Sequence, residues 1–254
     1  MRNRRSKRAG EWVVGINSVL ALLHSENRRV FHILVSRDKT DRNIDKVIEI
    51  AMEKGYQITS VDKNYLTHET GIEHNQGIAV LAEPISFISI ETLIDTAVVE
   101  PSKPLIMLDG IEDPRNLGAI VRTAEFLGAC GVIIRKVRQS PITPVALKSA
   151  EGAFEYTPIT IVANLANTLR DVKKNGIWAV SLEEDADMSL YDFDPPSPLI
   201  LVVGGEGLGV SRLLKDMCDV DVRIPTYGKT PSLNVSVALG IALYYIRMRL
   251  SKDN

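Results

Sequence analysis

The sequence has few of the residues that build metal clusters, disulfide networks or membrane spans. Cys130 and Cys218 are the only cysteines among 254 residues, and neither lies in a Cys-x-x-Cys pair or a Cys/His cluster. A metal site is therefore not expected, and two unpatterned cysteines favour a reducing compartment. No apolar run reaches the roughly 18 residues of a membrane span, and no signal peptide is recognisable. We expect a cytoplasmic protein with no membrane partner.

A global excess of basic charge is also missing, because the formal net charge is −2. The charge is nevertheless uneven. Residues 1–10 form a basic arm without an acidic residue, which contains Arg2, Arg4, Arg5, Lys7 and Arg8. A solvated tail and an arm that binds RNA phosphates both fit this pattern.

The hydrophobic pattern predicts two α/β domains with a linker between them. Residues 11–83 are expected to form a small α/β unit, and residues 84–103, with prolines at their margins, a linker. From 104 to 254 apolar runs alternate with helical patterns, which is typical of a mainly parallel sheet with helices on both faces. Strands are predicted at 105–109, 131–135, 158–162, 177–182, 199–203 and 222–225, and helices at 116–128, 141–150, 164–174, 210–217 and 231–249.

Three polar or glycine-rich segments follow predicted strands. The first runs from Asp109 to Ala124, the second from Gly204 to Gly209, and the third from Thr230 to Ala238. In open α/β sheets, ligands bind at the carboxyl ends of the strands. The three segments are therefore expected to converge on one site.

The second segment holds four glycines in six residues, with Glu206 between them. It lacks the spacing of a dinucleotide-binding fold and the Lys-Ser/Thr of a P-loop. A tight turn needs only one or two glycines, so we interpret the excess as close approach of a ligand to the backbone.

The third segment predicts a helix from residue 231, capped by Thr230. Ser232, Asn234 and Ser236 are mediocre helix formers, yet the helix that follows is apolar on nearly all sides. Such a helix is buried, so its first turn is expected to be buried too. Its polar groups would then need nearby backbone or a ligand as partners.

Two residues of the first segment allow two interpretations each. Asn116 fits a helix N-cap as well as a site residue. Arg122 is expected near the apolar side of its helix, and a partly buried arginine needs an anion. The partner would be Glu206 or Glu125 in a structural role, and a phosphate in a functional one.

Together the three segments resemble the SpoU (TrmH) family of the SPOUT RNA methyltransferases. The family motifs match Asn116, Gly118 and Arg122-Thr123-Ala124, then the glycine turn around Glu206, then Ile224-Pro225 with Ser232 to Ser236. This resemblance covers about residues 104–249. Residues 12–19 and 74–79 are similar to the L30e/L7Ae-like substrate-binding domain of the family. Where many relatives have Ser-Ala-Gly-Ala, this chain reads Ser149-Ala150-Glu151-Gly152-Ala153.

The resemblance implies a fold, a cofactor and an activity. The fold is a parallel sheet with a deep trefoil knot, in a homodimer that binds S-adenosyl-L-methionine. Gly204, Gly205, Ile224 and Leu233 would hold this cofactor, and Asn116, Arg122, Glu206, Ser232 and Asn234 would form the catalytic surroundings. The implied activity is 2′-O-methylation of RNA ribose, on a guanosine of 23S rRNA. A tRNA methyltransferase of the same family and a non-catalytic RNA-binding relative are the alternatives.

The role of Arg122 has two versions. A cation beside a ribose hydroxyl favours its ionised form and also holds the adjacent phosphate. A role as general base would require a depressed pKa, because arginine is normally always protonated. We favour positioning and electrostatic activation.

Overall fold

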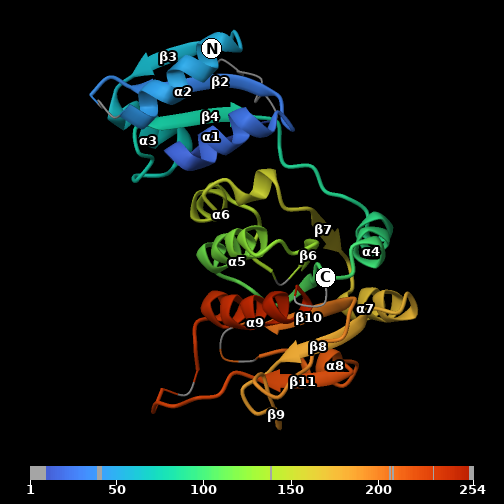
Figure 1. Ribbon diagram of the computed structural model, residues 1–254. Coiled ribbons are helices and arrows are strands. Elements are labelled where there is room, and N and C mark those ends of the chain that lie inside the picture. The colour runs from blue at the N-terminus through green and yellow to red at the C-terminus, as the bar shows by residue number, and fades with distance from the viewer. Residues whose placement is uncertain are drawn as a thin grey trace. The chain divides into compact units, whose positions relative to one another are not determined.

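The computed structural model describes residues 10–38, 42–137, 139–205, 207, 209–230 and 232–251. Glu206 and nearly all of the predicted basic arm lie outside these residues. The chain forms two compact units (Figure 1). The first contains the chain up to Ser86 together with Ile142–Tyr156, and the second contains Phe87–Pro141 and the chain from Thr157 onward.

The first unit is a small four-stranded sheet with helices. Its strands β1 (Glu11–Val14), β2 (Val30–Ser36), β3 (Ile58–Val61) and β4 (Ile78–Ala82) lie in the order β1-β4-β2-β3. The helices that follow them are α1 (Ile16–Ser25), α2 (Arg42–Glu53) and α3 (Lys63–Thr70). In α2, Ile44, Val47 and Ala51 are buried because their spacing places them on one side of the helix.

Two short helices of the first unit come from a distant part of the chain. They are α6 (Pro144–Ser149), which contacts β1, and the 3-10 helix η1 (Ala153–Glu155), which contacts α1. The sequence pattern had grouped these residues with the βα repeat that begins at 104. Residues 142–156 therefore pack with the first unit, although they are distant from the rest of that unit in sequence.

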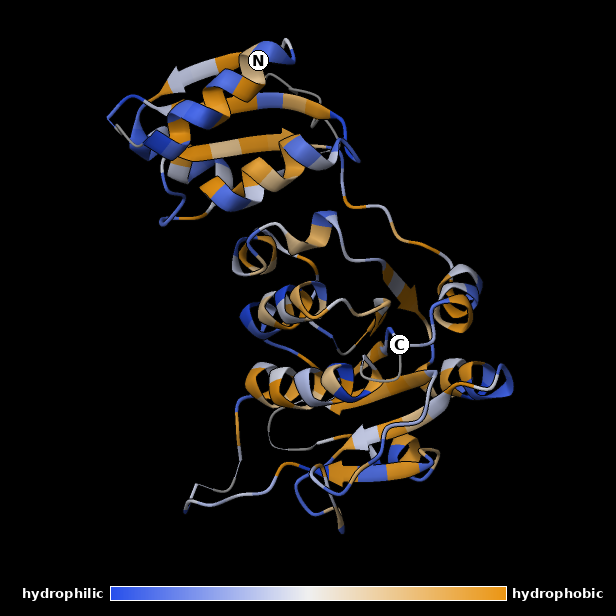
Figure 2. Ribbon diagram, viewed as in Figure 1, coloured by the Kyte–Doolittle hydropathy of each residue, from blue (hydrophilic) through white to orange (hydrophobic). Residues whose placement is uncertain are grey.

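The second unit contains a seven-stranded sheet in which every pairing is parallel. The strand order is β7-β6-β5-β10-β8-β11-β9. The strands are β5 (Leu105–Asp109), β6 (Gly131–Arg135), β7 (Ile159–Val162), β8 (Trp178–Leu182), β9 (Met188–Ser189), β10 (Leu199–Gly204) and β11 (Val220–Arg223). Figure 2 shows its central strands as largely hydrophobic ribbons. The predicted parallel α/β fold is confirmed, and the trefoil knot stays a prediction.

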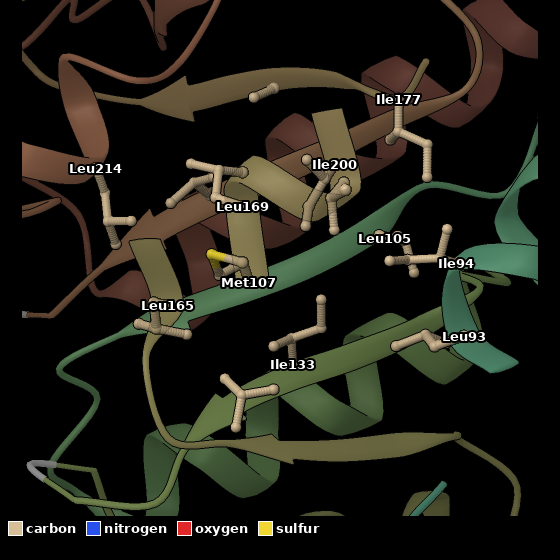
Figure 3. Close-up of a cluster of buried hydrophobic side chains, with 14 of the residues drawn as sticks. Leu93, Ile94, Leu105, Met107, Ile133, Leu165, Leu169, Ile177, Ile200 and Leu214 are labelled. Atoms are coloured by element: carbon tan, nitrogen blue, oxygen red, sulfur yellow. The ribbon is translucent and has the colours of Figure 1, made fainter. Parts of the chain in front are cut away.

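Helices cover both faces of this sheet. Leu105 and Met107 of β5 pack into a core with α4 (Ile90–Val99), α7 (Leu165–Lys174) and α8 (Arg212–Lys215) (Figure 3). Successive side chains of a strand point to opposite faces, so Ile106 and Leu108 face the other side. That side is covered by α5 (Pro114–Phe126) and α9 (Val235–Leu250), which pack against each other. Helix α9 also contacts β10.

Residues 84–103, which we predicted as a linker, contain helix α4. The Ser89 hydroxyl caps this helix by accepting the N–H of Thr92. Leu93, Ile94 and Ala97 are buried at helical spacing against the sheet. The prolines that suggested a linker lie outside the helix, where they do not interrupt its hydrogen bonds. No helix among the described residues is long and apolar enough to cross a membrane.

Candidate active site at the carboxyl edge of the parallel sheet

The parallel sheet brings the predicted site segments to one edge. β5, β10, β8 and β11 are neighbours in this order, and all four end on the same side because they are parallel. Asp109 is the last residue of β5 and Gly204 the last residue of β10, with Gly110 and Gly205 directly after them, and Ile224 follows β11. The expectation that the first two segments meet is confirmed by the pairing of Gly204 with Asp109.

The glycine turn packs on the backbone of the first segment. The N–H of Gly205 donates to the carbonyl of Asp109 at 2.9 Å. A Cβ on Gly205 would lie only 2.1 Å from the carbonyl oxygen of Gly110. We had interpreted the glycines as room for a ligand, but at Gly205 the close approach is to the protein's own backbone.

Glycine is needed at positions 204 and 207 of the turn for two different physical reasons. A Cβ on Gly204 would lie 1.8 Å from the carbonyl carbon of Gly209, whose N–H donates to the carbonyl of Gly205 at 3.1 Å. Gly207 has a φ of +85°, and no described atom beyond its chain neighbours lies within 4 Å of a built Cβ. Gly204 is therefore required by packing, whereas Gly207 is required by its left-handed conformation.

Helices α5 and α9 lie side by side and run in the same direction. Their packing brings the first and third segments into contact. Near their beginnings the amide of Asn234 donates to Oδ1 of Asn116 at 3.0 Å. Midway, Gly240 lies opposite Thr123, whose Cγ2 is 3.5 Å from a built Cβ. Toward their ends, Nε of Arg247 donates to the carbonyl of Leu127 at 2.9 Å. Two predicted catalytic residues, 118 positions apart in sequence, are thus in direct contact.

The third segment differs from our prediction in where its helix begins. α9 begins at Val235 and is capped by Asn234, whose Oδ1 accepts the N–H and hydroxyl of Ser236 at 3.0 and 2.6 Å. Asparagine, like threonine, is a preferred N-cap, so Asn234 can take the role that we had assigned to Thr230. Ser232, Leu233 and Asn234 are exposed, so the prediction of a buried first turn was wrong. Leu233 is 49% exposed and Ile224 is half-buried.

Arg122 is exposed, in contrast to the partly buried position that we predicted. The buried residues Leu117, Ile120, Val121 and Ala124 form the stripe of α5 that faces inward. Arg122 follows Val121 by one position, which corresponds to about 100° of helix rotation. Its side chain therefore projects away from the core, on the side of α5 that also carries the exposed Phe126.

Asp109 was not among the site residues predicted from sequence. This buried aspartate, the last residue of β5, accepts the N–H of Ser211 through Oδ2 at 2.9 Å, while its carbonyl accepts from Gly205. The side chain therefore holds the residues that follow the glycine turn, and the backbone holds the turn itself.

Glu183, directly after β8, was also missed. Its Oε1 accepts the N–H of Val210 at 3.1 Å, and its Oε2 lies 3.6 Å from Nζ of Lys215. Burial raises the pKa of Glu183, against the lowering effects of the Val210 N–H and Lys215. An acidic residue directly after an apolar run of residues was the available signal for both Asp109 and Glu183.

Among the described residues, no group of three or more His, Cys, Asp or Glu side chains could hold a metal ion. The polar groups of the edge are instead amides, carboxylates tied to backbone N–H groups, and one exposed guanidinium. Amides and a guanidinium bind polar organic ligands and phosphates.

Residues 103–244 match the model of the SpoU rRNA Methylase family, and residues 12–87 match a model described as RNA 2′-O ribose methyltransferase substrate binding. The chain belongs to the SpoU rRNA Methylase family. The order of the three segments and their meeting at one sheet edge agree with the resemblance drawn from the motifs.

Relatives match over nearly the whole chain. The 23S rRNA (guanosine-2′-O-)-methyltransferase RlmB of Pasteurella multocida is 36% identical, over 95% of this chain and 99% of its own length. The enzyme of the same name from Ralstonia nicotianae is 36% identical, over 91% of this chain and 93% of its own. The SpoU methyltransferase AviRb of Streptomyces viridochromogenes, in complex with AdoMet, has the same fold, with a TM-score of 0.77, 23% identity and coverage of 99% and 95%.

Proposed function

We propose that the protein transfers a methyl group from S-adenosyl-L-methionine to the ribose 2′-hydroxyl of a guanosine in 23S rRNA. The observation that carries the proposal is the contact of Asn234 with Asn116 in a chain that aligns with 23S rRNA guanosine methyltransferases over almost its full length. Family membership supplies the class of reaction. The meeting of the motif residues supports an intact site.

The residues at the sheet edge fit this cofactor. The four glycines between Gly204 and Gly209 carry no side chains, and at Gly207 no described atom outside its chain neighbours lies within 4 Å of a built Cβ. Leu233 is an exposed apolar side chain and Ile224 is half-buried, which suits contact with an adenine ring. We assign cofactor binding to Gly204, Gly205, Ile224 and Leu233. When bound, S-adenosylmethionine supplies an electrophilic methyl group.

The remaining residues act on the RNA side. Arg122 is exposed and carries a permanent charge, so its planar guanidinium is able to hold a phosphate and favour ionisation of a nearby hydroxyl. Asn116 and Asn234 orient each other through their hydrogen bond and present further polar groups. Ser232 and Glu206 complete the proposed catalytic set on the basis of the family motifs. Correct alignment of the hydroxyl provides a large part of the rate enhancement.

The two alternatives differ from this proposal in the RNA or in the chemistry. The segment that matches the substrate-binding model favours rRNA over tRNA as the substrate, as do the names of the full-length relatives. The presence of Arg122, Glu206 and Asn234 favours an active enzyme over a non-catalytic relative. We place the enzyme in the cytoplasm, where such RNA is made and modified.

We also propose that the enzyme is a homodimer in which α9 lies at the interface. Val237, Ile241, Tyr244 and Met248 form a stripe at helical spacing, and their exposed fractions are 49, 41, 61 and 38%. The opposite side of α9 is buried against its own unit through Leu239, Ala242, Leu243 and Ile246. An apolar stripe of this kind on a soluble protein marks an interaction surface.

The proposal is tested by mapping 2′-O-methyl groups in total RNA of a strain that lacks the protein. One guanosine of 23S rRNA should lose its methyl group and regain it when the gene is restored. Restoration with Arg122→Ala should leave the position unmethylated. A tRNA position that loses its methyl group instead would support the first alternative. Stoichiometric cofactor binding without methyl transfer to any RNA would support the second.

A further inference from the structure

The turn from Ser149 to Ala153 packs on helix α1 of the first unit. Gly152, with a φ of +96°, lies so near α1 that a Cβ there would be 2.3 Å from the Cβ of Ala21. Next to it, Oε2 of Glu151 accepts the amide of Asn17 at 2.8 Å. The hydroxyl of Tyr156 donates to the carbonyl of Ala21 at 3.3 Å. The departure from the Ser-Ala-Gly-Ala pattern thus lies at a contact with α1.

A buried arginine joins the same segment to two other parts of the unit. Arg28 is 6% exposed. It donates to Oε1 of Glu155 and to Oε2 of Glu11, each at 2.7 Å, and through Nε to the carbonyl of Glu83 at 2.6 Å. Burial raises the pKa of both Glu11 and Glu155, against the lowering effect of Arg28. Removing one member of such a buried cluster leaves the others without compensation, so loss of any one of them should weaken the attachment of the segment.

The attached segment is also continuous with the active-site edge. The chain passes between the two units at 86/87, 141/142 and 156/157. Just before the second passage, the N–H of Ser140 donates to the carbonyl of Ile111 at 2.7 Å, and the side chain of Gln139 accepts the N–H of Ile111 at 3.1 Å. Ile111 directly follows Gly110, on which the glycine turn packs.

We propose that the attachment of residues 142–156 to the RNA-binding unit, through Arg28 and Gly152, determines which ribose is methylated. This inference rests on the proposed function. A ribose hydroxyl and a phosphate are the same at every nucleotide, so the choice must come from RNA bound elsewhere on the protein. Residues 142–156 follow the loop that contacts Ile111 and precede β7, so their attachment to the first unit links RNA bound there, through the chain itself, to the active-site edge.

Gly152→Ala tests this attachment, with Gly55→Ala as its matched control. Both glycines lie in the first unit with a left-handed φ, of +96° and +71°. A Cβ at Gly152 would meet Ala21, whereas in the part of the chain that the structure describes nothing lies within 4 Å of one at Gly55. The backbone strain is therefore similar in the two variants, and only the contact with α1 differs.

The enzyme is assayed on 23S rRNA with mapping of the methylated positions. We expect Gly152→Ala to lower kcat/KM about 10²-fold, since misplacement far from the reacting atoms has effects of that size. The loss should lie mainly in KM, additional nucleotides should become methylated, and affinity for S-adenosylmethionine should stay within twofold of the control. A variant that methylates the same single nucleotide with the KM of the control would overturn the proposal.

A binding assay without cofactor separates this inference from the proposed function. The wild type and the Gly55→Ala control should prefer 23S rRNA to tRNA in competition, and Gly152→Ala should lose that preference. Retained preference in Gly152→Ala overturns the inference even if no methyl transfer is found. If Gly152→Ala fails to fold, Asn17→Ala, which removes only the exposed contact with Glu151, should shift the preference in the same direction. An unchanged preference in Asn17→Ala would then count against the inference.

Discussion

Gly205 and Gly110 lie backbone against backbone at the carboxyl ends of two neighbouring strands. The carbonyl oxygen of Gly110 would be only 2.1 Å from a Cβ on Gly205. This contact packs the glycine turn against the loop that precedes α5. It also means that the effect of a bulky residue at 205 on cofactor binding would not by itself reveal where the ligand lies.

Gly205→Ala and Gly207→Ala should therefore behave differently. The first inserts a methyl group into a filled contact, which typically costs about 1–3 kcal/mol, and should also abolish binding of S-adenosylmethionine. The second places alanine in a left-handed conformation at an open position, at a cost of about 1–2 kcal/mol, and should leave binding largely intact. Chemical denaturation and calorimetry distinguish the two. Equal loss of binding in both would indicate that the cofactor contacts Gly207 directly.

Asn234 has two roles that substitutions are able to separate. Asn234→Asp keeps the oxygen that caps α9 but removes the N–H that reaches Asn116, whereas Asn234→Ala removes both. The alanine variant should lose about 1 kcal/mol of stability, and the aspartate variant should stay near the wild type. Methyl transfer should fall in both. Full turnover by Asn234→Asp would show that the contact with Asn116 is not needed.

Arg122 should matter for the chemistry and not for the fold. Because it is exposed, Arg122→Ala is expected to change stability by no more than about 0.5 kcal/mol. It should abolish methyl transfer while cofactor affinity is retained. Arg122→Lys should also fail, because the planar fork is lost. Single-turnover assays with saturating RNA provide the measurement, and near-normal turnover by the lysine variant would reduce the role to local charge.

The apolar stripe of α9 predicts a dimer that one charge should disrupt. Ile241→Glu places a carboxylate in the middle of the stripe, where burial against a partner would strongly oppose it. Light scattering should show the wild type at twice the chain mass of 28.0 kDa and the variant at the chain mass. Val99→Glu, at a site that is 80% exposed outside the stripe, serves as the control and should stay dimeric.

Glu183 gives the stability a pH dependence of defined sign. Its pKa is raised above the ordinary 4.5 by burial, so the folded protein binds a proton more tightly than the unfolded chain. Its contribution to stability is then fully present below about pH 4.5 and is lost as the pH rises through the folded pKa. The free energy of unfolding of the wild type minus that of Glu183→Gln should decline over this range. Denaturant titrations at several pH values would contradict this if the difference were constant.

Most strands and helices of the second unit followed from the sequence because they depend on local patterns, whereas the short strand β9 and helix α4 were not predicted. Strands such as Leu105–Asp109 and Leu199–Gly204 are buried on both faces. They therefore appear as continuous apolar runs, which can be recognised as strands from their own sequence. The end of α9 was predicted to within one residue, but its beginning was not. Asn234 and Thr230 are both good caps, and local sequence does not choose between them.

The sequence by itself determined the family, the parallel α/β architecture and the three segments of the site, because motif spacing and hydrophobic periodicity are local properties. Tertiary structure alone decided which groups meet. The hydrogen bond from Asn234 to Asn116, the packing of Gly205 on Gly110 and the burial of Arg28 against Glu155 each join residues at least 95 positions apart. Such contacts arise from strand order and from chain passages between units, which leave no periodic signal in the residues themselves.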